Sequence, residues 1–113
     1  MQKFIALTAK KQTVYGEVTA DHIARGKRLS CRSCPVAFSV ASYGKHDLFV
    51  VVDWGHIRLS IGKHVISFRQ PDNIRNLISS FDGGCSVKPI TWSITGYGLD
   101  KYFNGAYIKE SKK

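Results

Sequence analysis

Residues 47–69 carry the pattern that most narrows the choice of fold. Residues 48–52 form a continuous apolar run, which is typical of a strand that is strongly buried or covered on both sides. Residues 56–61 then alternate between apolar and polar side chains, as a half-buried strand does. Gly62 begins a two-residue hairpin loop, and residues 64–69 continue as a third strand. The segment therefore predicts a three-stranded antiparallel meander.

Two main helices are expected to pack on this sheet. The first begins at Pro35, where the missing N–H costs nothing, so Cys34 is its N-cap and Gly44 its end. The second is expected to take Asp72 as its N-cap, and its spacing is the cleanest amphipathic pattern in the chain. Its apolar stripe consists of Ile74, Leu77, Ile78 and Phe81.

Shorter elements are expected on either side of these. Thr19 can cap a helix over residues 20–25, which Gly26 would end. Strands are expected at residues 4–9, 13–18 and 86–95, with residues 10–12 as the turn of an opening hairpin and Pro89 restricting the last strand to an edge or a bulge.

The whole pattern predicts an α+β fold, an antiparallel sheet of four or five strands with two main helices packed on it. At 113 residues the chain is expected to form a single domain. Residues 14–95 would be its core, and residues 1–13 and 96–113 would be extensions. The second extension is rich in aromatic residues, which is unusual for a plain disordered tail.

The charge balance points to an anionic partner. Seventeen Lys and Arg against eight Asp and Glu give a net charge of +9, which favours nucleic acid as that partner. A basic surface without such a partner is the alternative, because the charges are scattered. No apolar run approaches the roughly 20 residues of a membrane span, so we expect a protein of the reducing cytoplasm with no membrane partner.

One dense basic cluster lies in residues 25–32, just before the expected helix at Pro35. Cations there can neutralise phosphates, and aromatic side chains of the tail can stack on exposed bases. The residues expected to bind nucleic acid are Arg25, Lys27, Arg28, Arg32, Tyr97 and Tyr102.

Cys31 and Cys34 form the one close cysteine pair, and three interpretations of it stay open. Zinc needs four ligands, and the spacing of the remaining cysteine and the histidines follows no zinc-finger pattern. A redox motif would normally follow a strand in a βαβ unit. Buried, unreactive thiols are the third interpretation. We expect no metal site and no cofactor, with Cys31 and Cys34 as the weak metal candidates.

The histidines show no catalytic pattern. His56 and His64 are expected to lie opposite one another across the meander, where Arg58 and Arg69 would join them on a cationic outer face. The sequence contains no phosphate-binding loop, no dinucleotide glycine motif and no convincing pair of carboxylates. We therefore expect a protein that is not an enzyme.

The order of motifs resembles a group of small uncharacterised bacteriophage proteins. The resemblance covers residues 14–95 and rests on a Thr-x-x-His-Ile-x-x-Gly motif, a Cys-x-x-Cys-Pro motif and a Phe-Asp-x-Gly motif. It implies a phage gene product acting in the host bacterial cytoplasm, and it carries no specific activity. The matching positions are Thr19, His22, Ile23, Gly26, Cys31, Cys34, Pro35, Ala37, Phe81, Asp82, Gly84 and Pro89.

These observations leave two classes of function. The first is a small, basic, phage-encoded accessory protein that is not an enzyme and binds nucleic acid. The alternative is an inhibitor or modulator that binds a host bacterial protein, for host takeover or against host defence. An exposed aromatic patch rather than a continuous basic one would favour the alternative.

Overall fold

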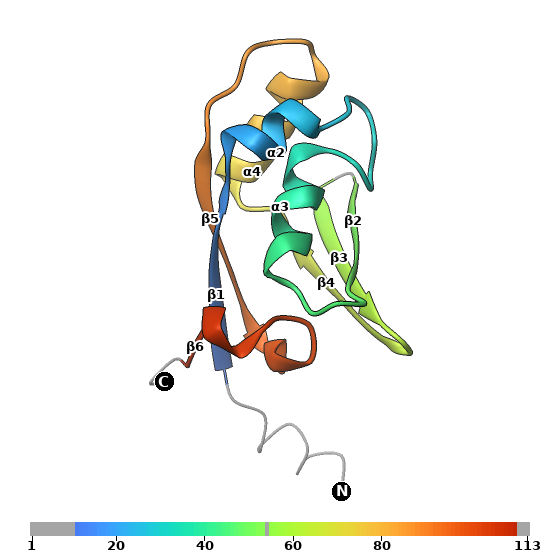
Figure 1. The fold of residues 1–113 in the computed structure, drawn as a ribbon, viewed down its shortest axis with the longest axis vertical. Coiled ribbons are helices and arrows are strands. Elements are labelled where there is room, and N and C mark those ends of the chain that lie inside the picture. Colours follow the sequence, from blue (N-terminus) through green and yellow to red (C-terminus); the bar gives the residue numbers. More distant parts are fainter. Residues whose placement is uncertain (1–10, 54, 111–113) are drawn as a thin grey trace, which may run out of the picture.

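Two antiparallel sheets of three strands carry the fold in the computed structural model, which describes residues 11–53 and 55–110 (Figure 1). One sheet has the order β5–β1–β6 and the other has the order β2–β3–β4. The α+β class is confirmed, but the expected single sheet of four or five strands is instead two sheets. The strands are β1 (Lys11–Val18), β2 (Phe49–Asp53), β3 (His56–Ile61), β4 (His64–Arg69), β5 (Ile90–Tyr97) and β6 (Ile108–Glu110).

The second sheet is the meander that its local sequence predicts. Strand β3 pairs antiparallel with β2 on one side and with β4 on the other. Gly62 lies at φ +56° in the β3–β4 turn, a conformation that favours glycine. The buried side chain of Gln70 donates hydrogen bonds to the carbonyl oxygens of Asp53 and His56, at 2.6 and 3.1 Å. These bonds hold the β2–β3 turn in place.

Strand β1 finds its partners far away in the sequence. It pairs along its whole length with β5, and Gln12 to Val14 also pair with β6. Lys11 and Gln12 are therefore strand residues and not the expected turn. The expected strand at residues 4–9 lies outside the described residues. In the β1–β5 pair Gly16 faces Trp92, and a Cβ at Gly16 would meet the indole ring at 2.1 Å, so this position requires glycine.

Three α-helices connect and cover the strands: α2 (Ala20–Arg25), α3 (Pro35–Tyr43) and α4 (Asp72–Asp82). The N-cap of α3 is Cys34, whose Sγ accepts the Ala37 N–H at 3.4 Å, as predicted. The prediction for α4 was wrong by one residue. Its N-cap is Pro71, and Asp72 is the first helical residue, whose Oδ1 accepts from Arg75 at 2.6 Å.

Helix α3 contacts both β1 and β2 and so joins the two sheets (Figure 1). Its Ser39 Oγ donates to the Glu17 carbonyl at 2.6 Å and accepts from Trp92 Nε1 at 2.8 Å. The Tyr43 hydroxyl accepts the Glu17 N–H at 3.1 Å. Since β6 pairs only with residues 12–14, these bonds satisfy the N–H and the carbonyl of Glu17 in the part of the β1 edge that β6 leaves open.

The segment after β5 belongs to the core. Leu99 and Phe103 are fully buried, and two 3₁₀ turns, Leu99–Lys101 and Gly105–Tyr107, lead into β6. The core therefore extends beyond the expected limit at residue 95. Strand β5 begins at Ile90 and not at residue 86, which leaves Pro89 outside the strand, where its missing N–H breaks no pairing.

Candidate nucleic-acid interface

The six residues predicted to bind nucleic acid do not share one surface. Arg25 lies on α2, where its Nε donates to Asp21 Oδ2 at 2.9 Å and its guanidinium lies 5.0 Å from the centroid of the Phe38 ring. The Asp21 carboxylate offsets the Arg25 charge, and so Arg25 is a poor candidate for phosphate binding.

The two tail tyrosines are also poor candidates. Tyr102 was predicted to stack on bases, but its side chain is only 5% exposed, and burial raises its pKa. Tyr97 is exposed, but it pairs with Lys11, at the opposite end of β1 from Val18 and α2. Because a strand rises about 3.3 Å per residue, these two ends lie roughly 23 Å apart.

The loop of residues 26–33, called the anchored loop below, holds Lys27, Arg28 and Arg32. The Lys27 N–H donates to the Ser33 carbonyl at 2.8 Å and closes the loop. The Arg28 Nε donates to the Asp82 carbonyl at 3.3 Å. The Cys31 carbonyl accepts the Val52 N–H at 2.7 Å, which fastens the loop along the edge of β2.

The meander presents one face to solvent, and we call it the meander face. Its inner face buries Val50, Val52, Ile57 and Leu59, so the residues between them point outward. The register sets these outward residues in three rows across the strands. The rows are Phe49–Ser60–Val65, Val51–Arg58–Ser67 and Asp53–His56–Arg69.

This register confirms one part of the expected cationic face and corrects another. His56, Arg58 and Arg69 do lie on the meander face, and His56 is the direct cross-strand neighbour of Arg69. His64 pairs instead with Ile61, in a row of the opposite face. His56 and His64 are therefore not opposite one another. The two-residue loop at Gly62 and Lys63 fixes this register.

The anchored loop and the meander face meet at an aromatic–cation pair. The Arg32 guanidinium lies 4.3 Å from the centroid of the Phe49 ring, and Phe49 is 42% exposed. Phe49 was predicted only as part of a buried strand. Its outward position could not have been found from the sequence, because residues 48–52 are a continuous apolar run in which nothing distinguishes the two faces of the strand.

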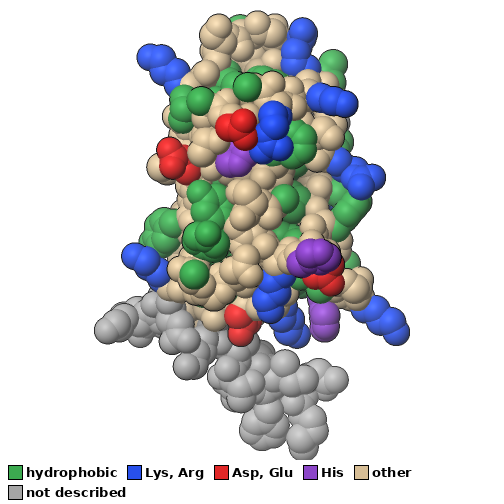
Figure 2. Space-filling view, in the orientation of Figure 1, with side chains coloured by type: hydrophobic (Ala, Val, Ile, Leu, Met, Phe, Trp, Pro, Cys, Tyr) green, Lys and Arg blue, Asp and Glu red, His purple; other side chains and the backbone are tan. Residues whose placement is uncertain are grey.

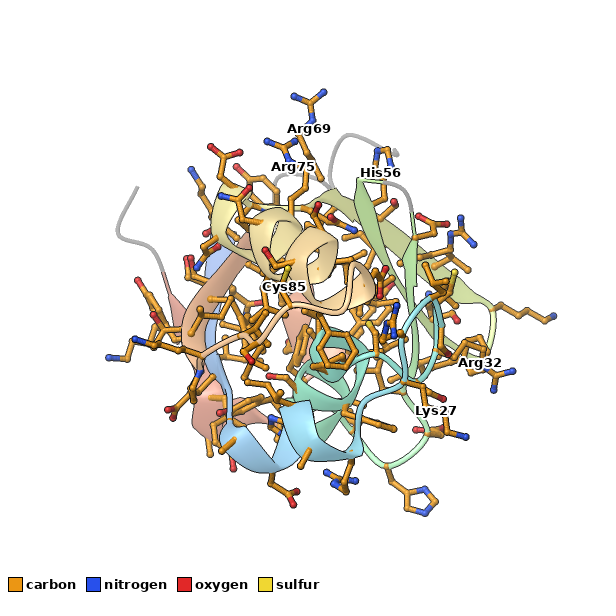
Figure 3. The ribbon with its side chains drawn as sticks, turned by 90° about the horizontal axis from the view of Figure 1, so that it is seen from above. Lys27, Arg32, His56, Arg69, Arg75 and Cys85 are labelled. Carbon is orange, nitrogen blue, oxygen red and sulfur yellow. The ribbon has the colours of Figure 1, made fainter. Side chains whose placement is uncertain are left out.

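The labelled side chains of the anchored loop and of the meander face point outward as two groups, in different directions. In Figure 3, Lys27 and Arg32 project from the anchored loop, and His56 and Arg69 project from β3 and β4, all away from the interior. Arg58 Nη2 lies 3.2 Å from Asp53 Oδ2, which offsets part of the charge. Figure 2 shows Lys and Arg side chains at several edges of the visible face as well as on it, so the positive charge is not confined to one patch of that face.

The cysteines do not come together as ligands would. Burial raises the pKa of the Cys34 thiol, which keeps it neutral, while Cys31 and Cys85 are exposed. Cys85 lies near the middle of the view in Figure 3, away from the anchored loop cations Lys27 and Arg32. Within residues 11–53 and 55–110, no three Cys, His, Asp or Glu side chains are grouped to hold a metal ion.

No family model, curated protein or solved structure matches this chain. Among the described residues, no helix is long and apolar enough to cross a membrane.

Proposed function

We propose that this chain is a non-enzymatic binding protein for single-stranded nucleic acid, with little sequence preference. The observation that carries the proposal is the Arg32–Phe49 pair, set between the cations of the anchored loop and those of the meander face. The resemblance to bacteriophage proteins suggests an accessory role in the cytoplasm of an infected bacterium.

Stacking supports a single strand over a duplex. Proteins that bind single strands combine a cationic path for the backbone with planar groups on which bases stack. A guanidinium that lies over an aromatic ring offers such a plane, and an exposed sheet leaves room for splayed bases. The bases of a duplex are already stacked on one another and present only their edges.

Electrostatics sets the expected strength of binding. Lys27 and Arg32 on the loop and Arg69 on β4 are exposed and can each neutralise one phosphate. For single strands, log K falls with log salt by roughly 0.7 per neutralised phosphate. Three contacts therefore predict a slope near −2.

Fluorescence anisotropy with labelled single-stranded oligonucleotides, titrated at several salt concentrations, tests the proposal. Replacing Lys27, Arg32 and Arg69 together with Gln should weaken binding and flatten the salt slope by about 2. The matched control replaces Lys11, Lys88 and Lys101, which are exposed cations of the other sheet and its loops. It removes the same charge and should leave most of the affinity and most of the slope.

Two results would contradict the proposal. Equal loss in both triple variants would show that only net charge matters and that this surface is no specific site. Absence of binding to single-stranded DNA and RNA at about 50 mM salt would leave the positive charge to another partner, and a host protein would then become the leading candidate.

A further inference from the structure

Leu29, at the tip of the anchored loop, combines two unusual features. Its side chain is 79% exposed, the most exposed of the large hydrophobic side chains in the described part of the chain. Its backbone lies at φ +58°, and among residues 11–53 and 55–110 it is the one non-glycine residue with a positive φ. This conformation costs free energy for a side chain of this size, and a glycine would relieve it.

The protein holds this strained conformation by direct bonds. Asp82 Oδ1 accepts the Leu29 N–H at 2.9 Å, and the Arg28 side chain bonds to the Asp82 carbonyl. On the other side of the tip, Ser30 Oγ accepts the Ser33 N–H at 3.1 Å. These bonds hold the loop in one conformation, in which the Leu29 side chain points into solvent. Backbone strain of this kind is concentrated at functional positions in proteins.

The neighbours of Leu29 indicate what it meets. Lys27, Arg28 and Arg32 lie within three residues of Leu29 in the chain, and the Asp82 carboxylate that accepts the Leu29 N–H offsets one of their charges. The apolar side chain of Leu29 therefore projects from a loop that keeps an excess of positive charge. Proteins that bind the minor groove of a duplex use this combination: basic and polar side chains contact the nucleic acid while an apolar side chain enters between neighbouring bases and unstacks them. Bases of a single strand stack on one another in the same way and can be separated by the same kind of side chain. An apolar protein surface would be a less favourable partner for the charged residues of this loop.

Resting on the function proposed above, we infer that Leu29 is a wedge that inserts between two adjacent bases of the bound strand. The cations of the loop hold the backbone on either side of the insertion. The bases separated in this way become available to stack on the Arg32–Phe49 pair.

The test uses the full chain and an oligodeoxynucleotide with 2-aminopurine between adenines, whose fluorescence increases when the base unstacks. Binding of the wild-type protein should raise this fluorescence several-fold. Leu29→Ala should remove most of the increase while anisotropy still shows binding with the same salt slope. Leu29→Met keeps a long apolar side chain and should retain the increase.

The outcomes separate the wedge from the binding function. If the wild type binds without a rise in fluorescence, or if Leu29→Ala gives the same rise, the wedge is wrong and the proposed function stands. If the wild type does not bind single strands at all, both the proposed function and the wedge are wrong. Circular dichroism shows whether each variant is folded, as expected for changes at so exposed a side chain.

Discussion

His22 occupies the third position of α2, and its side chain bonds to the backbone at the start of that helix. Its Nδ1 accepts the Thr19 N–H at 2.9 Å, and Thr19 Oγ1 accepts the His22 N–H at 3.2 Å. The pair forms a capping box, with histidine where glutamate or glutamine is common. Cys34 has a similar role at α3, so both residues are explained by helix N-termini.

The capping role of His22 predicts a pH dependence of stability. Burial, and then the nearby Arg25 charge, lower the pKa of His22 below its ordinary value of 6.5. The capping bond needs the neutral ring, because Nδ1 must be unprotonated to accept the Thr19 N–H. The unfolded chain therefore binds a proton before the folded one does. The stability that His22 contributes is present above pH 6.5 and is lost as pH falls from there through the lower folded pKa.

Urea denaturation at pH 7.5 and at about pH 5 measures this loss, which should lie within the roughly 0.5–2 kcal/mol of a helix N-cap. His22→Gln keeps a capping-box acceptor but does not titrate, so its loss between the two pH values should be smaller. Equal losses in the two proteins would assign the pH dependence to other groups.

At the scale of elements, the accuracy of the sequence predictions follows the range of the contacts. The meander was predicted because its two turns are local, and α3 was predicted because Pro35 and Gly44 mark its ends. The partners of β1 were not predicted, because nothing in the sequence near Val14 indicates that Ile94 lies beside it. The sequence patterns of the single strands are the same whether the strands form two sheets of three or one larger sheet, so these patterns could not distinguish the two arrangements.

The residues of the candidate site also divide into those that local sequence predicts and those that depend on long-range contacts. Arg58 and Arg69 could be placed on one face from strand alternation alone. The Arg32–Phe49 pair depends on how the anchored loop lies along β2, which the sequence does not show. Tyr102 was misplaced because an aromatic residue among lysines and glycines has the same composition in a tail as in a buried turn.

The packing of α3 against the first sheet carries a prediction about Ser39. Its hydroxyl is fully buried and bonds both Trp92 and Glu17, so Ser39→Ala leaves an indole N–H and a carbonyl without partners. The free energy of unfolding should fall by about 1–3 kcal/mol.

Chemical denaturation followed by circular dichroism tests this value. Ser42→Ala makes the same chemical change on the same helix at an exposed position and should cost no more than about 0.5 kcal/mol. A similar small loss for Ser39→Ala would mean that Trp92 finds another acceptor.

At the scale of the whole molecule, the segment after residue 95 closes the fold. Phe103 is fully buried, and Gly44 forms an isolated β-bridge with it, so this segment touches the end of α3 as well as the first sheet. Phe103→Ala should therefore cost about 3–5 kcal/mol, as in other cores. Tyr97→Ala, at an exposed aromatic residue of β5, is the control and should cost less than about 1 kcal/mol. Comparable urea midpoints for the two variants would show that the segment after residue 95 contributes little to the stability of the core.

The long-range pairing of β1 determines the order in which the chain can fold as it leaves the ribosome. Val18 pairs with Ile90, and Gln12 pairs with Glu110, so β1 emerges long before its partners exist. The meander needs only its own neighbours and can form while synthesis continues, because contacts that close short loops are made first. Until β5 has been synthesised, Val14 and Val18 remain exposed on an unpaired strand, although both are completely buried in the folded protein. The nascent chain therefore depends on the emergence of β5 and then β6 for protection against aggregation, and pauses in translation before β5 extend the exposed interval.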